Sequence, residues 1–263
     1  MKRISTIILL LTSVLLIGAD AQFKRKCEPK KPCAETLEDC PREGCSEDNH
    51  HDPNLNKLKN LKSSTKLIED KSLDEMIALE KEVEKSDYER GDARKVLTDL
   101  GEGSQIRVVG YLLAVKQECG ESCNCGLHDV DVTTDNHLVL VTPDRIKGQF
   151  ELKPHSTKKR ISAMFHKREA GSVTAEFTPR VRANGHPNFT SDVQDMLNKT
   201  AQGALWVRVT GQLMFDSEHF HHKPLNRKTS WEVHPILKFE YCPSGKKCPA
   251  TGDTNWVDLD DQP

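Results

Sequence analysis

The sequence predicts a mainly β protein built around a five-stranded, OB-type Greek-key barrel with a helix between its third and fourth strands. Three observations carry this prediction. Five segments in the second half of the chain are β-rich, a short helical pattern separates the third from the fourth, and two of the segments have a central glycine. Three strands, one helix and two strands is the chain order of an OB fold. Another small barrel or an α+β sandwich is the alternative.

The five predicted strands span 106–115, 129–141, 172–181, 205–215 and 230–241. Gly110 and Gly211 are the central glycines, and each indicates a bulge or a sharp bend. Ser191 is the expected N-cap of a helix over 191–197. We expect the core of the barrel to consist mostly of Val139, Ala175, Phe177, Val207, Val209, Leu213, Val233 and Ile236.

A helical segment over 66–100 precedes the barrel, which we place at 101–243, with a tail at 244–263. Apolar residues spaced three and four apart predict a helix over 66–88. Ser72 is its candidate N-cap, because Glu75 stands three residues later, as a capping box requires. A second helical turn is expected at 93–100. The apolar stripe predicts that this segment packs on the barrel.

The first 21 residues have the pattern of a secretory signal peptide. Lys2 and Arg3 precede an apolar run over 7–17, and Ala19 and Ala21 offer the small residues needed for cleavage before Gln22. The alternative is a membrane anchor, for which this run is short, since a spanning helix needs ~20 apolar residues. We therefore expect an exported protein, secreted or periplasmic, with no membrane span after cleavage.

Residues 22–65 form a polar, Cys-rich extension that we expect to be disordered, because it has few apolar side chains to bury. All 9 cysteines follow the signal peptide. Export permits disulfides, and an odd number leaves one thiol free or bonded to another molecule. Cys242 and Cys248 are candidates for a short disulfide loop. The four N-terminal cysteines are candidates for pairing among themselves, and the sequence does not fix which pairs form.

Six segments of the barrel region resemble a group of uncharacterised exported bacterial proteins with OB-fold-like domains: VVGYLLAVKQE, ESCNC, DNHLVLV, VTAEFTPR, VRVTGQLMFDSEH and RKTSWEVHP. The resemblance covers roughly residues 100–241. It implies the barrel and export, and it assigns no catalytic residue.

Two loops of the predicted barrel carry sulfur and imidazole groups. The first joins the first two strands and the second spans 216–229, and OB topology places both at one end of the barrel. The first loop contains Cys119 close to Cys123 and Cys125, so disulfide bonding is one interpretation. The other is a metal site, because Zn²⁺ takes Cys and His ligands in tetrahedral geometry, although C-x3-C-x-C is not a familiar finger spacing. Its candidate ligands are Cys123, Cys125, His128, His219, His221 and His222.

A second polar set lies on the strands, where alternation places residues two apart on one face. We take it as a candidate ligand-binding surface: Asp135, His137, Glu176, Arg180, Asp216, His219, Arg227, Trp231, Glu232 and His234. A buried architectural network is one alternative. A metal-dependent hydrolase is another, with Asp135, His137, Glu176, His219, Glu232 and His234 as the active residues.

The charge of the chain is nearly balanced, with a formal net charge of -2. That excludes strong, sequence-independent binding of the whole surface to nucleic acid. The insertion over 145–168 is basic, however, and adjoins the ligand-binding side expected of an OB barrel. We therefore predict a non-enzymatic binding module for an extended polyanion, a nucleic acid or an oligosaccharide. No cofactor is expected, and a divalent metal ion or a structural, protein-interaction role is the alternative.

Overall fold

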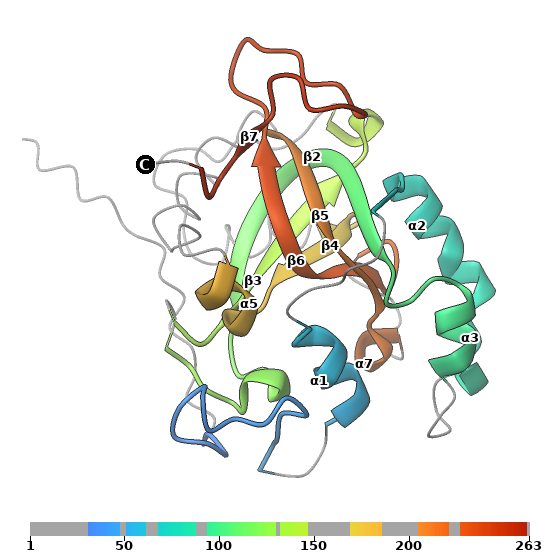
Figure 1. Cartoon of the computed structure of the whole chain (residues 1–263). Helices are drawn as coiled ribbons and strands as arrows, with labels where there is room; N and C mark the ends of the chain where they lie inside the picture. Colours follow the sequence, from blue (N-terminus) through green and yellow to red (C-terminus); the bar gives the residue numbers. More distant parts are fainter. Residues whose placement is uncertain are drawn as a thin grey trace, which may run out of the picture.

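The computed structural model describes residues 31–47, 51–61, 68–87, 94–129, 132–146, 169–185, 205–220 and 227–261 (Figure 1). The predicted signal peptide, the predicted helix at 191–197, most of the 145–168 insertion, and His221 and His222 lie outside these residues.

Five strands close into a mixed β-barrel: β2 (Gln105–Glu118), β3 (Asp135–Val141), β4 (Val173–Phe177), β5 (Leu205–Phe215) and β6 (Trp231–Tyr241). Strand β2 pairs with β3 at one end and with β5 at the other, all antiparallel. Strands β4 and β6 are parallel, and β5–β6 closes the ring. The predicted mainly β fold is confirmed, and this strand order is consistent with an OB-type barrel.

The two central glycines permit close approaches between chains. A Cβ on Gly110 would lie 2.8 Å from Leu73 Cδ1, and β2 pairs regularly there, with its irregularity at Leu112/Ala114. A Cβ on Gly211 would lie 2.4 Å from the Pro235 carbonyl oxygen, and the β5–β6 register shifts on both sides of Gly211. The bulge is therefore confirmed at Gly211, whereas Gly110 makes room for a helix.

The predicted helix at 66–88 is shorter and broken in the structure. Strand β1 (Glu69–Asp70) comes first, followed by α2 (Leu73–Leu79) and the 3₁₀ turns η1 (Glu80–Glu82) and η2 (Lys85–Asp87). The capping box of Ser72 and Glu75 is confirmed. Glu80 accepts hydrogen bonds from Ser230 N (2.8 Å) and Thr229 Oγ1 (3.0 Å) where the helix tightens. Helix α3 (Arg94–Asp99) occupies the expected second turn.

The third strand also ends early, at Phe177 instead of 181. Helix α5 (Pro179–Gly185) begins at Pro179, which suits a first helical position because its missing N–H would have no intrahelical partner. Short elements occupy the loops: η4 (Ser122–Asn124), η5 (Pro143–Ile146) and α7 (Ser217–Phe220). The tail contributes β7 (Val257–Asp258), which pairs with β6, and the predicted Cys242–Cys248 disulfide is present.

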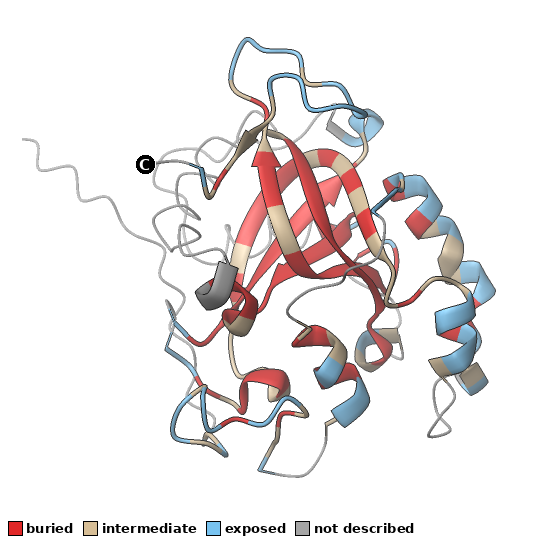
Figure 2. Cartoon of the chain, viewed as in Figure 1, coloured by how far each residue is buried: buried red, intermediate tan, exposed pale blue. Residues whose placement is uncertain are grey.

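The main apolar core fills the barrel and extends under α2 and α3 (Figure 2). Seven of the eight predicted core residues belong to it; Val139 instead packs in a small cluster with Leu113, Ala114 and Val141. Leu73 and Met76 of α2 and Leu97 of α3 are buried in the main core. The helical segment is therefore part of the same folded unit.

The N-terminal extension differs most from its prediction. Residues 31–47 and 51–61, which we call the cover segment, are ordered and contain α1 (Pro53–Lys59). Disulfides Cys33–Cys45 and Cys40–Cys125 fix the segment, and the second joins it to the loop after β2. Cross-linking replaces the missing apolar core, because it lowers the entropy of the unfolded chain.

Candidate functional site

Polar side chains gather on the outer face of β3, β4 and β6. The alternate residues Leu138, Ala175 and Val233 belong to the core, so alternation turns the polar set away from it. His137 and Glu176 stand directly opposite each other across β3 and β4. The residues of this face are nevertheless less than a tenth exposed: Asp135, His137, Thr174, Glu176, Glu232 and His234.

Three of these residues form what we call the carboxylate–histidine cluster: Asp135, Glu176 and His234. One ligand atom from each lies within 4.8 Å of the others. His234 Nε2 is 4.0 Å from Asp135 Oδ2, and His234 Nδ1 is 3.6 Å from Glu176 Oε2. Two carboxylates and one imidazole are donors that divalent metal ions accept.

A neighbouring side chain orients each member of the cluster. Asn124 Nδ2 donates to Asp135 Oδ1 at 2.7 Å. His137 Nδ1 lies 2.9 Å from Glu176 Oε1. His234 Nδ1 lies 3.2 Å from Glu232 Oε2. In each case a neighbouring side chain holds one atom of the group, which is the arrangement that orients metal ligands in proteins.

The ring nitrogen Nε2 of His234 has no hydrogen-bond partner, although the side chain is fully buried. Asp135 Oδ2, at 4.0 Å, is beyond hydrogen-bonding distance. When Glu232 accepts the proton of Nδ1, Nε2 presents its lone pair towards Asp135. An unpartnered, buried nitrogen beside two acids indicates a missing ligand.

Beside the cluster, Arg227 bridges two further acids. Its guanidinium lies 2.5 Å from both Asp216 Oδ2 and Glu232 Oε1, and it donates to Thr174 Oγ1 at 3.1 Å. His219 Nδ1 lies 2.5 Å from Asp216 Oδ2, with its side chain half exposed. Arg227 therefore forms ion pairs with Asp216 and Glu232. It also interacts electrostatically with Glu176, and Lys59 does so with Asp135.

Burial and crowding shift the ionisation of this face. Burial, followed by the charge of Glu176, raises the pKa of Asp135 well above its usual value. Burial also raises the pKa of Glu232 well above the ordinary range, against the pull of Arg227. It lowers the pKa of His234 to about 4 and that of His137 to about 3. Both imidazoles are thus neutral near pH 7, the form that binds metals.

The hydrogen bond with Asp216 is the main cause of the shifted pKa of His219, which rises to about 9. Burial opposes the ionisation of Asp216, but the hydrogen bond from His219 and the charge of Arg227 outweigh it. The pKa of Asp216 therefore lies well below its usual value. His219 and Asp216 therefore form a charged pair at the rim of the polar face.

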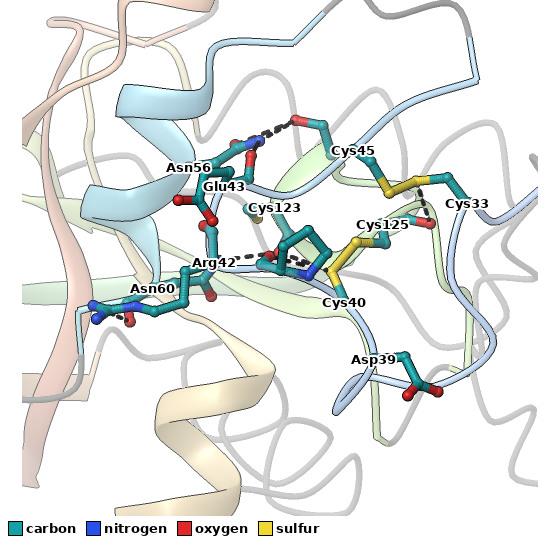
Figure 3. Close-up of a disulfide and its surroundings, with 12 residues drawn as sticks. Cys33, Asp39, Cys40, Arg42, Glu43, Cys45, Asn56, Asn60, Cys123 and Cys125 are labelled. Atoms are coloured by element: carbon teal, nitrogen blue, oxygen red, sulfur yellow. Dashed lines mark hydrogen bonds between the residues drawn. A yellow bond between two sulfur atoms is a disulfide. The ribbon is translucent and has the colours of Figure 1, made fainter.

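The cover segment contacts β6 and the loop after β2 at one end of the barrel (Figure 1), where the Cys40–Cys125 disulfide fastens it (Figure 3). Gln212 Nε2 donates to both the Leu58 and the His234 carbonyl oxygens, each at 3.3 Å, which links α1 to β6. Lys59 Nζ is 3.3 Å from Glu121 Oε2. A Cβ at Gly44 would lie only 2.1 Å from the Ser122 carbonyl oxygen, so this contact depends on glycine.

Helix α1 also connects the two loops singled out in the sequence. Lys59, at its end, contacts Glu121 of the first loop. At its start, the Asp52 N–H donates to Glu218 Oε1 of the second loop at 3.4 Å. Both loops therefore meet α1, as their expected placement at one end of the barrel requires.

The metal site predicted between these loops is not formed by the described residues. Cys125 is bonded to Cys40, and His128 and His219 are exposed. Among the described cysteines, only Cys123 keeps a free thiol, which is fully buried beside Asp135. Cys119 is also in a disulfide.

Two members of the predicted ligand-binding surface lie elsewhere. Trp231 is fully buried in the core, 5.2 Å from the ring of Phe215, because alternation turns it inward. Arg180 donates to the carbonyl oxygens of Cys40 and Pro41, so it fastens the cover segment. The other eight predicted residues lie in or beside the polar face, and all except His219 at the rim are buried instead of forming an open surface.

Four residues of the site were not predicted: Lys59, Glu121, Asn124 and Gln212. Asn124 is part of the ESCNC segment, in which the neighbouring Cys125 indicated a disulfide-bonded and therefore ordered loop. The composition around Lys59 does not indicate that its side chain is buried. The burial depends on the Cys40–Cys125 disulfide, which brings this part of the chain to the barrel.

No protein-family model, curated protein or solved structure matches the chain. The resemblance to exported OB-fold-like proteins therefore stays a prediction. Within the described ranges, no helix is long and apolar enough to cross a bilayer.

Proposed function

We propose that this is an exported metal-binding protein, in which the carboxylate–histidine cluster holds one divalent cation beneath the cover segment. The observation that carries the proposal is the unpartnered His234 Nε2, fully buried and 4.0 Å from Asp135 Oδ2. Tetrahedral ligands ~2.1 Å from a zinc ion lie roughly 3.4 Å apart, and one ligand atom from each residue already lies within 4.8 Å of the others, so binding would draw these atoms inward. Export is supported by the disulfides of the described chain.

A cation would also offset the electrostatic cost of the cluster. Asp135 and Glu176 are buried together with no direct positive partner among the described residues. Buried acids in that position are expensive to ionise. An ion between them would favour the charged form of Asp135, whose pKa burial raises, and would give His234 Nε2 a partner.

Burial favours a stabilising ion over a catalytic one. A catalytic metal keeps one coordination position open to substrate, whereas the three proposed ligands are less than a tenth exposed. The same burial weakens the prediction that an extended polymer binds across these strands, because the polar side chains of this face are not accessible to it. Binding of a polyanion by the 145–168 insertion stays a separate prediction.

The test is the metal content of full-length protein purified without an affinity tag and with its disulfides intact. We expect about one zinc-class ion per chain by mass spectrometry of the elements. An ion present at ~100 times its Kd stabilises a fold by about 2.7 kcal/mol, so removing it with a chelator should lower Tm by roughly 5–10 °C.

His234→Gln and Glu176→Gln should each abolish the stoichiometric ion and the chelator effect, since each removes a charged or lone-pair ligand while keeping the side-chain size. His128→Gln is the matched control, because His128 is an exposed loop histidine. Wild-type protein that binds no added Zn²⁺, Mn²⁺ or Co²⁺, and whose Tm ignores the chelator, would refute the proposal.

A further inference from the structure

The buried thiol of Cys123 adjoins the proposed metal site. Its Sγ lies 3.8 Å from Asp135 Oδ2, the same oxygen that faces His234 Nε2. Cys123 Sγ also forms a second compact group with acid oxygens of Glu121 and Asp135, all within 4.8 Å. Asp135 is thus shared by two sets of metal-ligating atoms, one containing the imidazole and the other the thiol.

The backbone of Cys123 is fixed from two sides. Asn60 Nδ2 of the cover segment donates to its carbonyl oxygen at 3.1 Å. Two residues later, Cys125 is tied to Cys40 and adopts a left-handed conformation with φ 56. The disulfide that fastens the cover segment therefore also fixes the backbone next to Cys123 (Figure 3), whose thiol lies 3.8 Å from Asp135 Oδ2.

The free state of this thiol contrasts with its surroundings. Every other cysteine in the described ranges is in a disulfide. A structural buried cysteine normally packs as a small apolar group, yet Cys123 faces a carboxylate, with Asn124 and Glu121 nearby. Because Cys123 is fully buried, its thiol is also not available for a bond to a second molecule in this fold.

We propose that Cys123 is a fourth protein ligand of the ion held by Asp135, Glu176 and His234, and that its thiolate makes the site select zinc-class ions over magnesium or calcium. This inference rests on the proposed function. Thiolates favour Zn²⁺ and similar ions, whereas Mg²⁺ and Ca²⁺ prefer oxygen ligands alone. On binding, the S–H bond breaks, the sulfur keeps the electron pair for the metal, and the proton leaves to solvent.

The test compares full-length, disulfide-intact wild type with Cys123→Ser in titrations with Co²⁺ and Zn²⁺. Wild type bound to Co²⁺ should show the near-ultraviolet absorption of a sulfur-to-cobalt charge transfer, and the variant should lack it. Zn²⁺ affinity should fall at least about tenfold, since changes outside the ligand shell already cost 10–100-fold. Wild type should also release about one more proton per Zn²⁺ than the variant.

Mn²⁺, which accepts oxygen ligands readily, should bind wild type and Cys123→Ser with similar affinity. His128→Gln should keep the cobalt absorption. Should Cys123→Ser fail to fold, Cys123→Ala, which leaves no unpaired hydroxyl, carries the same expectations. Cobalt binding to wild type without the sulfur absorption, or unchanged Zn²⁺ affinity of the variant, overturns the role of Cys123 alone. Absence of any binding to wild type overturns the metal site itself.

Discussion

At the scale of single residues, His234 shows how the free-energy cost of an unpartnered buried atom indicates a missing ligand. A buried polar atom without a partner costs about 1–3 kcal/mol, and the Nε2 of His234 is such an atom. Its other nitrogen is held by Glu232, so the ring cannot turn to satisfy Nε2 without losing that contact. A ligand at this nitrogen is the simplest way for the fold to recover the cost.

The His219–Asp216 pair gives a pH-dependent prediction. The folded-state pKa of His219, about 9, exceeds the unfolded value of ~6.5. Its stabilisation is therefore complete below pH 6.5 and is lost as the pH rises through 9. Because the side chain is 53% exposed, we expect His219→Gln to cost about 0.5–1 kcal/mol at pH 6 and almost nothing at pH 10.

Urea denaturation of wild type and His219→Gln at pH 6, 8 and 10 measures this difference. His128→Gln, in the other loop and exposed, is the control and should track wild type throughout. A penalty for His219→Gln that is the same at all three pH values would mean that the Asp216 pair does not stabilise the fold through its charge.

At the scale of elements, the cover segment depends on covalent attachment. The Cys40–Cys125 disulfide spans a sequence separation of 85, whereas Cys242–Cys248 spans 6. Loop-closure entropy predicts that removing the first costs about 4–5 kcal/mol and removing the second about 2 kcal/mol. We expect the Ser double variant at positions 40 and 125 to be the less stable of the two in urea denaturation.

Hydrogen exchange should locate the effect of the longer bridge. The amides of α1 should exchange faster in the 40/125 variant and remain protected in the 242/248 variant, because only the first bridge ties the cover segment to the barrel. Equal protection of α1 in both variants would show that non-covalent contacts such as Lys59–Glu121 hold the segment.

The strands were predictable where local pattern and packing agree. Strand β5 has the predicted bounds, 205–215, because an alternating run ends cleanly on both sides. Strand β4 was predicted too long, since Val181 prolongs the apolar pattern past Pro179, where a helix begins. The cover segment has no such pattern. Its order comes from a disulfide whose pairing the sequence leaves open.

At the scale of the whole molecule, topology explains which part of the site was predictable. Asp135, Glu176 and His234 could be grouped in advance because an OB barrel puts β3, β4 and β6 side by side. Their burial could not be foreseen, since it depends on a segment more than 70 residues earlier in the chain that returns over the sheet. An expected open surface therefore became an enclosed site.

The barrel alone, residues 101–243, should not fold as an independent unit. It lacks five residues of the main core: Leu73, Met76, Val83, Leu97 and Leu259. At ~1.5–3 kcal/mol for each buried side chain, their loss removes about 7–15 kcal/mol, as much as the ~5–15 kcal/mol by which a domain is stable. We expect no cooperative thermal transition by circular dichroism.

A longer fragment, 68–261 with Cys119 and Cys125 changed to Ser, separates the core from the cover segment. It keeps all five core residues and loses only the cover, so it should melt cooperatively at a lower Tm than the full chain. It should also expose the polar face, so that diethyl pyrocarbonate modifies His234 in the fragment and not in the full chain. A cooperative 101–243 fragment would show instead that α2, α3 and β7 are accessory to the barrel, and that strand closure alone sustains the fold.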